Sequence, residues 1–319
     1  MHPLIARIHP ALRTALWAWF LSRCALWLIA PGRLLHFETG TPVVGLVSTA
    51  TEHLRSTASS PVADALLAAA PWVIVEVAIL LAALSVYRFA RRTELPQVAE
   101  RACWLWLFNP LLILNAADWG TQMAAATGTM AVAALVTHRP RLAAAAAIIA
   151  VGCRLEFILL WPAIAVASWV HLRDKESMVP LVLGVVTVPL AFTAWIAASW
   201  HLAGATNTSL RAMHGDSAWR QWTSMSLDFP QEWLMMVGLA AALVLTAAYF
   251  RRFPRWYALC AVPAIGWPML QTPATFAAVT AVWAVPAYVY LAVSCDDRRV
   301  ERAVMAALII AFCLVLLGT

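Results

Sequence analysis

The sequence has few charged residues and almost no lysine. Of its 319 residues, 12% are Asp, Glu, Lys or Arg, and Lys175 is the single lysine, whereas 63% are apolar and 17 are tryptophan. Soluble domains carry about 25% charged residues, so this shortage excludes an ordinary soluble domain and indicates an integral membrane protein. The basic residues lie in short gaps between apolar runs, as membrane topology requires, which argues against nucleic acid as a partner.

Common catalytic and metal-binding motifs are also missing. The six cysteines are scattered without CxxC spacing, which favours small buried side chains over disulfides or a metal cluster. No two histidines are spaced i, i+4 with a carboxylate in step, so the spacing of side chains predicts no metal site. Serine hydrolase, Walker and Rossmann motifs are absent.

Eleven apolar segments are candidates for membrane-spanning helices, which need roughly 20 apolar residues each. The segments run approximately over 14–31, 66–87, 102–117, 119–137, 142–153, 155–172, 178–203, 231–250, 256–270, 275–294 and 303–318. The first has Arg23 near its centre and no small-residue cleavage site, so we expect it to be retained as a span. With no repeat or linker, the sequence predicts an all-α polytopic protein with one domain over residues 1–319.

The arginines predict how these helices are oriented. If the N-terminus is cytoplasmic, sixteen of the 22 Lys and Arg residues fall on that side, as the positive-inside rule requires. They are Arg7, Arg13, Arg88, Arg91, Arg92, Arg101, Arg139, Arg141, Arg173, Lys175, Arg251, Arg252, Arg255, Arg298, Arg299 and Arg302. The C-terminus is then extracytoplasmic, and the two longer loops, 32–65 and 204–230, lie outside.

Two charged residues, Arg23 and Glu76, lie in the middle of predicted spans. Either would be costly if it faced lipid, and counting along each helix puts them at similar depth. We therefore predict that they contact each other and hold the first two spans together. A functional role for Arg23 is the alternative.

The segment 142–153 is too short to cross a membrane, since its twelve residues span only about 18 Å at a rise of ~1.5 Å each. Arg154 and Glu156 follow it directly, with no loop before the next apolar run. Irregular backbone is tolerated at membrane depth where it lines a water-filled recess. Two interpretations of Arg154 remain open, a ligand for a lipid phosphate and a structural partner of Glu156.

Two further outer regions carry polar side chains. In the stretch FNPLLILNAADWGTQM (108–123), Asp118 lies where one predicted span turns into the next on the outer side. The loop 204–230 mixes aromatic residues with His214 and Arg220. That mixture suits either sugar stacking or an interfacial aromatic belt.

Several stretches resemble the membrane mannosyltransferases of the glycosylphosphatidylinositol mannosyltransferase II (PIG-V) type and their bacterial relatives, which have the GT-C fold. They are WFLSRCALWL, VYRFARRTELPQVAERACWLWLFNP, RPRLAAAAAIIAVGCRLEFILLWPAIA and, more weakly, RRFPRWYALCAVPAIGWPML. The resemblance covers most of the chain in family order. It implies a bacterial plasma-membrane enzyme that transfers mannose from a polyprenyl-phosphate donor to a lipid or protein acceptor on the outer face.

The resemblance also implies roles for particular residues. The family uses an outer carboxylate as base, and Glu38 is the acid nearest the expected place, with Asp118 the second candidate. Arg154 matches the family pattern, and Trp119 lies where the family has a Tyr-Ser/Thr-Glu element. The family's Trp-Asp motif after the first helix is replaced here by other residues. A divalent cation assists in some members of the fold class.

If the chain is an enzyme, Glu38 or Asp118 would deprotonate the acceptor hydroxyl, and Arg154, oriented by Glu156, would stabilise the departing lipid phosphate. A second hypothesis is a catalytically inactive relative that binds lipid-linked sugar or stabilises a partner membrane protein, as the missing Trp-Asp motif suggests. A transporter or flippase is the third. It would be expected to show polar residues along several helices at the membrane midplane.

Overall fold

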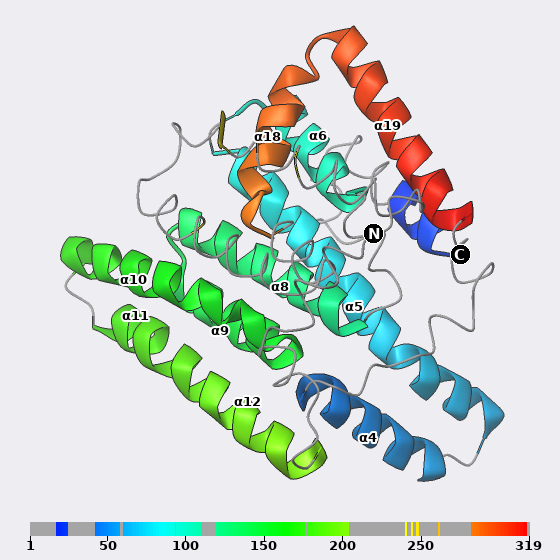
Figure 1. Ribbon diagram of the computed structural model, residues 1–319, viewed down its shortest axis with the longest axis vertical. Helices are drawn as coiled ribbons and strands as arrows, with labels where there is room; N and C mark the ends of the chain where they lie inside the picture. Colours follow the sequence, from blue (N-terminus) through cyan, green and yellow to red (C-terminus); the bar gives the residue numbers. More distant parts are fainter. Residues whose placement is uncertain are drawn as a thin grey trace, which may run out of the picture.

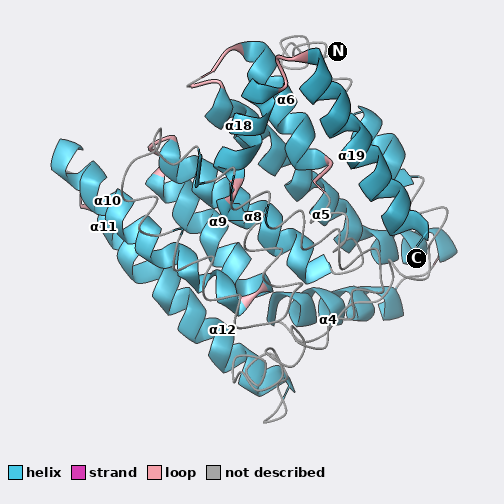
Figure 2. Cartoon of the chain, turned by 45° about the horizontal axis from the view of Figure 1, so that its top comes forward, coloured by secondary structure: helices cyan, strands magenta, loops and turns pink. Residues whose placement is uncertain are grey.

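The computed structural model describes the larger part of the chain as helices (Figure 1). The described residues are 17–24, 42–57, 60–92, 94–109, 119–175, 178–203, 240, 244, 247–248, 261 and 282–317. Of these, 91% are helical and none is in a strand (Figure 2), so the all-α fold class predicted from the sequence is correct. The predicted site residues Glu38, Asp118, His214 and Arg220 lie outside the described residues.

The helices follow one another with short connections. In chain order they are α4 (Pro42–Thr57), α5 (Pro61–Ala90), α6 (Pro96–Leu107), α8 (Trp119–Val136), α9 (Pro140–Cys153), the 3₁₀ helix η1 (Leu155–Leu160), α10 (Trp161–Lys175), α11 (Val179–Val182), the π-helix η2 (Leu183–Thr187), α12 (Val188–Ala203), α18 (Val285–Ser294) and α19 (Arg298–Leu317). Residues 17–24 are also helical. Several helices begin with proline at the first or second position, where a missing N–H costs no helical hydrogen bond.

Helix α8 is the centre of the packing. Of its 18 residues 15 are buried, and most are Ala, Gly or Thr, so neighbouring backbones can approach on every side. It packs most extensively against α9 and α5, and α5 also packs against α6. A Cβ atom on Gly128 of α8 would lie only 2.7 Å from Cε1 of Phe157, so this glycine lets η1 lie against α8.

A second glycine, Gly152, allows three helices to meet near the C-terminal end of α9. A Cβ atom there would lie 2.5 Å from the Val43 side chain of α4 and 2.8 Å from the Trp195 ring of α12. The indole N–H of Trp195 also donates to the carbonyl of Ile148 in α9, at 3.3 Å. The close approach of α4, α9 and α12 therefore depends on the absence of a side chain at residue 152.

Helix α5 combines a buried side with an exposed apolar side. It is the one described helix that is both long enough, at 30 residues, and apolar enough to cross a membrane, and only 33% of its most apolar window is buried. The exposed side carries Val73, Ile74, Val77 and Leu81. Four shorter apolar helical segments, at 140–153, 155–170, 184–198 and 285–294, accompany it. Named helices overlap seven other predicted spans and the helical residues 17–24 overlap an eighth, but membrane crossing by eleven helices stays a prediction.

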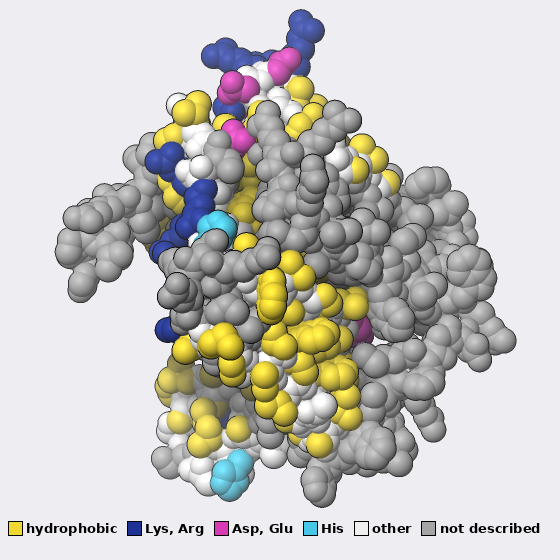
Figure 3. All heavy atoms as spheres, turned by 90° about the vertical axis from the view of Figure 1, so that its left-hand side faces the viewer, with side chains coloured by type: hydrophobic (Ala, Val, Ile, Leu, Met, Phe, Trp, Pro, Cys, Tyr) yellow, Lys and Arg dark blue, Asp and Glu magenta, His cyan; other side chains and the backbone are white. Residues whose placement is uncertain are grey.

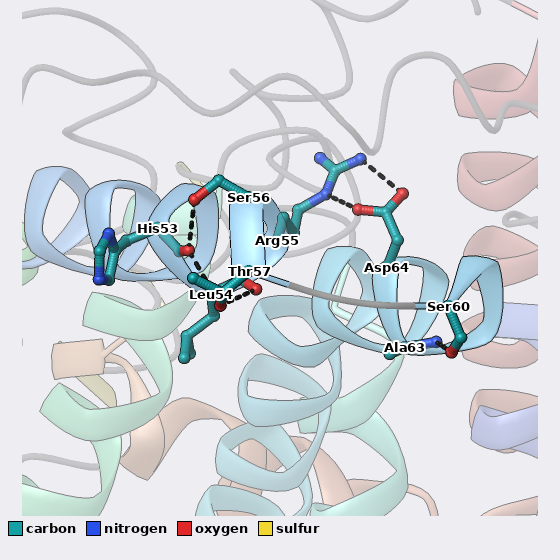
Figure 4. Close-up of polar contacts among 8 residues, drawn as sticks. All are labelled: His53, Leu54, Arg55, Ser56, Thr57, Ser60, Ala63 and Asp64. Carbon is teal, nitrogen blue, oxygen red and sulfur yellow. Dashed lines mark hydrogen bonds and ion pairs between the residues drawn. The ribbon is translucent and has the colours of Figure 1, made fainter.

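An exposed ion pair closes the corner between α4 and α5 (Figure 4). The Arg55 guanidinium donates to both carboxylate oxygens of Asp64, at 2.6 Å and 3.1 Å. Ser60 caps α5 by accepting from the N–H of Ala63, at 3.2 Å. Both side chains of the ion pair are 45% exposed, so water screens the attraction, and we expect the pair to add little to stability.

The turn from α8 to α9 is a Schellman motif. The N–H of His138 donates to the Leu135 carbonyl at 3.0 Å, and the N–H of Arg139 donates to the Ala134 carbonyl at 2.8 Å. His138 has the left-handed φ of 56° that this motif requires, a conformation that glycine adopts at least cost. The turn reverses the chain within three residues and places α9 antiparallel to α8.

We expect His138→Gly to raise the free energy of unfolding by about 0.5–1 kcal/mol, because glycine removes the strain of the left-handed conformation. His53, exposed in the regular helix α4, provides the control. His53→Gly should lower the free energy of unfolding by roughly 0.5 kcal/mol, since glycine is a poor helix former. Reversible unfolding in detergent measures both, and equal losses would show that the turn is not strained.

Candidate functional site

Arg23, Glu76 and Gln122 form a buried polar network between residues 17–24, α5 and α8. The Nε of Arg23 lies 3.1 Å from Oε1 of Glu76, so the contact predicted from their matched depth is present. The same guanidinium donates through an Nη2 hydrogen to Oε1 of Gln122, at 2.9 Å. The side chains of Arg23 and Glu76 are 7% and 23% exposed. The network therefore links three helices inside an apolar bundle.

The aromatic side chain of Trp19 contacts both members of this ion pair. The indole N–H of Trp19 donates to Oε2 of Glu76 at 3.1 Å, so both carboxylate oxygens have a partner. The Arg23 guanidinium carbon lies 4.2 Å from the centre of the Trp19 ring, which is a cation–π distance. Phe108 of the α6 C-terminus meets the Trp19 ring edge-on, at 5.9 Å between centroids. Trp19, Glu76 and Gln122 thus hold the buried guanidinium by a cation–π contact, an ion pair and one hydrogen bond, although its Nε has no partner with hydrogen-bond geometry.

Arg154 lies in the break between α9 and η1. Its backbone is extended, with φ −149° and ψ 115°, and it both ends α9 and precedes η1. Its Nε lies 3.8 Å from Oε2 of Glu156, and the two side chains are 17% and 13% exposed. A charge-assisted hydrogen bond is roughly 2.7–2.9 Å long, so the contact between these two groups is ionic. The predicted irregular backbone at this position is present.

The two polar clusters lie at similar depth along α8. Arg154 and Gln122 are each sixteen residues from His138, at the turn of the antiparallel α8–α9 hairpin. They are therefore at about the same height along the hairpin, since both helices rise ~1.5 Å per residue. Because η1 packs directly against α8, this helix has the Arg154 segment and the Arg23 network as neighbours.

Trp119, which the resemblance places where the family has a Tyr-Ser/Thr-Glu element and for which we expect a substrate-binding role, has a structural contact in this arrangement. Its side chain is 2% exposed and its indole N–H donates to the carbonyl of Pro71 in α5, at 2.7 Å. It therefore packs between α5 and α8 and does not present an open face on which a sugar could stack. The convergence of Glu38, Asp118 and Arg154 on one outer cavity stays a prediction, since two of these residues lie outside the described part.

Sequence reasoning missed Gln122 and Trp19 as members of the buried network. Gln122 is one of few strongly polar residues in α8, and that isolation in an apolar helix was the available signal. Among the described residues, no group of three or more His, Cys, Asp or Glu could hold a metal ion.

Comparison of the chain with protein-family models, curated proteins and solved structures finds no match in any of the three. The resemblance to the mannosyltransferases therefore rests on the sequence motifs alone. The geometry of the two polar clusters is independent of that resemblance.

We expect Glu76→Gln to destabilise the protein by about 3 kcal/mol, because it leaves the Arg23 charge buried without an anionic partner. Asp64→Asn makes the same chemical change in the same helix, but in the exposed pair with Arg55. It should leave the unfolding midpoint nearly unchanged. The double variant Arg23→Met/Glu76→Met, which removes both charges, should lose less than Glu76→Gln alone.

Thermal or denaturant unfolding in one detergent compares the four proteins. Equal midpoints for Glu76→Gln and Asp64→Asn would show that the buried pair contributes no more than the exposed one. A double variant at least as unstable as Glu76→Gln would contradict the role of the unpaired charge.

Proposed function

We propose that the protein is an integral membrane glycosyltransferase with a GT-C-like arrangement of about eleven spanning helices. It would transfer mannose from a polyprenyl-phosphate donor to a lipid or protein acceptor on the extracytoplasmic face. Support for a membrane location comes from α5, whose exposed side carries large apolar side chains that lipid would cover. A bacterial plasma membrane is the location that the sequence resemblance implies.

The distribution of arginines supports one orientation in that membrane. Arg88 and Arg92 end α5, Arg139 and Arg141 flank the start of α9, and Arg298 begins α19. In Figure 1 the end of α5 lies in the upper left of the picture and the α18–α19 turn at the top, whereas α4 lies at the bottom. Figure 3, which views the left-hand side of the molecule in Figure 1, shows Lys and Arg side chains gathered along one edge. This is the pattern expected of a cytoplasmic face.

The observation that carries the proposed chemistry is the position of Arg154. It lies in a helix break, partly buried and 3.8 Å from Glu156, at the end of α9 remote from the basic edge. A guanidinium there can contact two oxygens of a lipid phosphate and stabilise its negative charge as it leaves. Glu156 would orient it. The acceptor oxygen attacks the sugar C1, the C1–phosphate bond breaks, and Glu38 or Asp118 takes the hydroxyl proton.

A second candidate function is a non-catalytic subunit that binds lipid-linked sugar or stabilises a partner membrane protein. The observation that favours it is the burial of Trp119 against Pro71, at the position where the resembled family has a polar catalytic element. In this case Arg154 would still contact the lipid phosphate, but no residue would act as a catalytic base. His214 and Arg220 would contact the sugar in either case.

Transfer of radiolabelled mannose from a polyprenyl-phosphate donor, measured with purified protein and a set of lipid and peptide acceptors, tests the proposal. Arg154→Ala should lower kcat by about 10²–10³-fold, as loss of a charge-stabilising donor does. Glu38→Gln should lower it by about 10²–10⁴-fold and leave donor binding intact. Arg141→Ala, an exposed arginine at the other end of α9, is the matched control and should leave transfer unchanged.

The outcomes separate the two candidates. Donor binding that depends on Arg154, with no transfer to any acceptor, would favour the non-catalytic subunit. Transfer that is unchanged in both Glu38→Gln and Asp118→Asn would contradict the assignment of the base. Equal effects of Arg154→Ala and Arg141→Ala would contradict the role of the helix break.

A further inference from the structure

A surface cavity of about 330 Å³ lies at the end of the bundle remote from Arg154, between α5, α8 and the start of α9. Clefts that hold small ligands measure roughly 300–1,000 Å³. Three arginines line it, Arg88 and Arg92 from α5 and Arg139 from the α8–α9 turn. None of the described acidic residues lines this cavity. Nothing in the proposed sugar transfer uses it.

The three guanidinium groups are brought together by tertiary structure. Arg88 lies in the last turn of α5 and Arg92 lies two residues after its end, Ala90, so both line the cavity from the same end of this helix and their like charges repel each other. The Schellman turn adds Arg139 from the opposite wall. Within the described part of the chain, none of the three is in an ion pair. A bound anion would relieve this repulsion.

The cavity has a cationic end and an apolar end. Along α8 it is lined by Met130, Ala133, Ala134 and Thr137, which fall on one face at helical spacing. Met130 and Ala133 lie toward the middle of the bundle, whereas the three arginines lie at the helix ends. The small side chains of Ala133 and Ala134 leave the space between the two helices open. An anion with an apolar tail fits this polarity better than a free ion.

The available hydrogen-bond donors also favour a phosphate. The hydroxyls of Ser85 and Thr137 line the cavity, but each donates to a carbonyl of its own helix, Leu81 and Ala134 respectively. The guanidinium groups of Arg88, Arg92 and Arg139 therefore remain as donors, and their planar shape suits paired phosphate oxygens. The first turn of α9, which begins at the cavity, adds the positive end of a helix dipole.

We propose that this cavity binds the phosphate headgroup of an anionic phospholipid from the cytoplasmic leaflet, with the start of an acyl chain along Met130 and Ala133. Basic pockets between helices on the cytoplasmic side are suited to such headgroups. The occupant is a lipid rather than a soluble phosphate because the apolar wall runs inward from the arginines. The bound lipid would fasten the α8–α9 turn to α5 and fix the orientation of the bundle in the membrane.

Native mass spectrometry of the full chain in detergent, titrated with phosphatidylglycerol, tests the proposal. The triple variant Arg88→Gln/Arg92→Gln/Arg139→Gln should bind this lipid on the order of 100-fold more weakly, at ~1 kcal/mol for each arginine. The control triple variant Arg91→Gln/Arg141→Gln/Arg298→Gln removes the same charge from exposed arginines that do not line the cavity. It should retain binding to within a few-fold.

Further arms separate lipid from free phosphate and binding from folding. Phosphatidylcholine should not compete, and inorganic phosphate or glycerol phosphate should compete only at far higher concentration. Arg88, Arg92 and Arg139 are exposed, so their removal should leave the lipid-free unfolding midpoint unchanged. If the triple variant fails to fold, the single variant Arg88→Gln, expected to weaken binding about 5-fold, takes its place.

Three results would overturn the proposal. Equal weakening in the two triple variants would show general attraction to a basic surface. Inorganic phosphate that competes as well as the lipid would assign the cavity to a soluble anion. Retained lipid binding in Arg88→Gln and in the cavity triple variant would show that the lipid binds elsewhere. None of these results depends on mannosyl transfer, so the proposed function is tested separately.

Discussion

The burial of α8 on all sides is the constraint on which the rest of the bundle depends. A helix can be enclosed by neighbours at close range only if its side chains are small, and α8 meets this need with alanine, glycine and threonine along most of its length. In a membrane, where no water-driven hydrophobic force acts between helices, such close packing would supply much of the association energy. Each feature of interest contacts this helix. Gln122 joins the buried ion pair, Gly128 lies against Phe157, and Met130 lines the basic cavity.

Electrostatic cost explains why the charged groups are arranged differently at different depths. Inside the bundle Arg23 is matched by Glu76 and Gln122, because an unpaired buried charge would be expensive. At the corner of α4 and α5, the Arg55–Asp64 pair is exposed and water reduces its value. At the end of α5 the arginines need no partner for stability, because they are exposed. Arginine therefore has a structural role inside the bundle and is available to bind an anion at the end of α5.

Much of the helical framework could be predicted from the sequence, because apolar runs separated by arginines and prolines mark helix ends. The predicted segments 119–137, 142–153 and 155–172 correspond closely to α8, α9 and η1 with α10, and the contact of Arg23 with Glu76 followed from counting residues. The predicted segment 102–117 begins six residues inside α6, which starts at Pro96. The polar residues Gln97, Glu100 and Arg101 hid the first turns. These side chains lower the local hydropathy, so a hydropathy criterion starts the segment after them. Pro96 marks the start of the helix whatever the polarity of the residues that follow.

The parts of the site that could not be predicted are those that depend on rotation of one helix against another. The sequence predicts that Trp119 is at the start of α8, but only packing shows that its indole N–H reaches the carbonyl of Pro71. Likewise, Arg88, Arg92 and Arg139 were assigned to one side of the membrane by their charge alone. Their enclosure of a common cavity requires the left-handed His138, which brings the start of α9 back beside α5 and α8. The left-handed conformation of His138 thus lets Arg139 line the same cavity as Arg88 and Arg92. Local sequence patterns contain little information about backbone conformations of this kind.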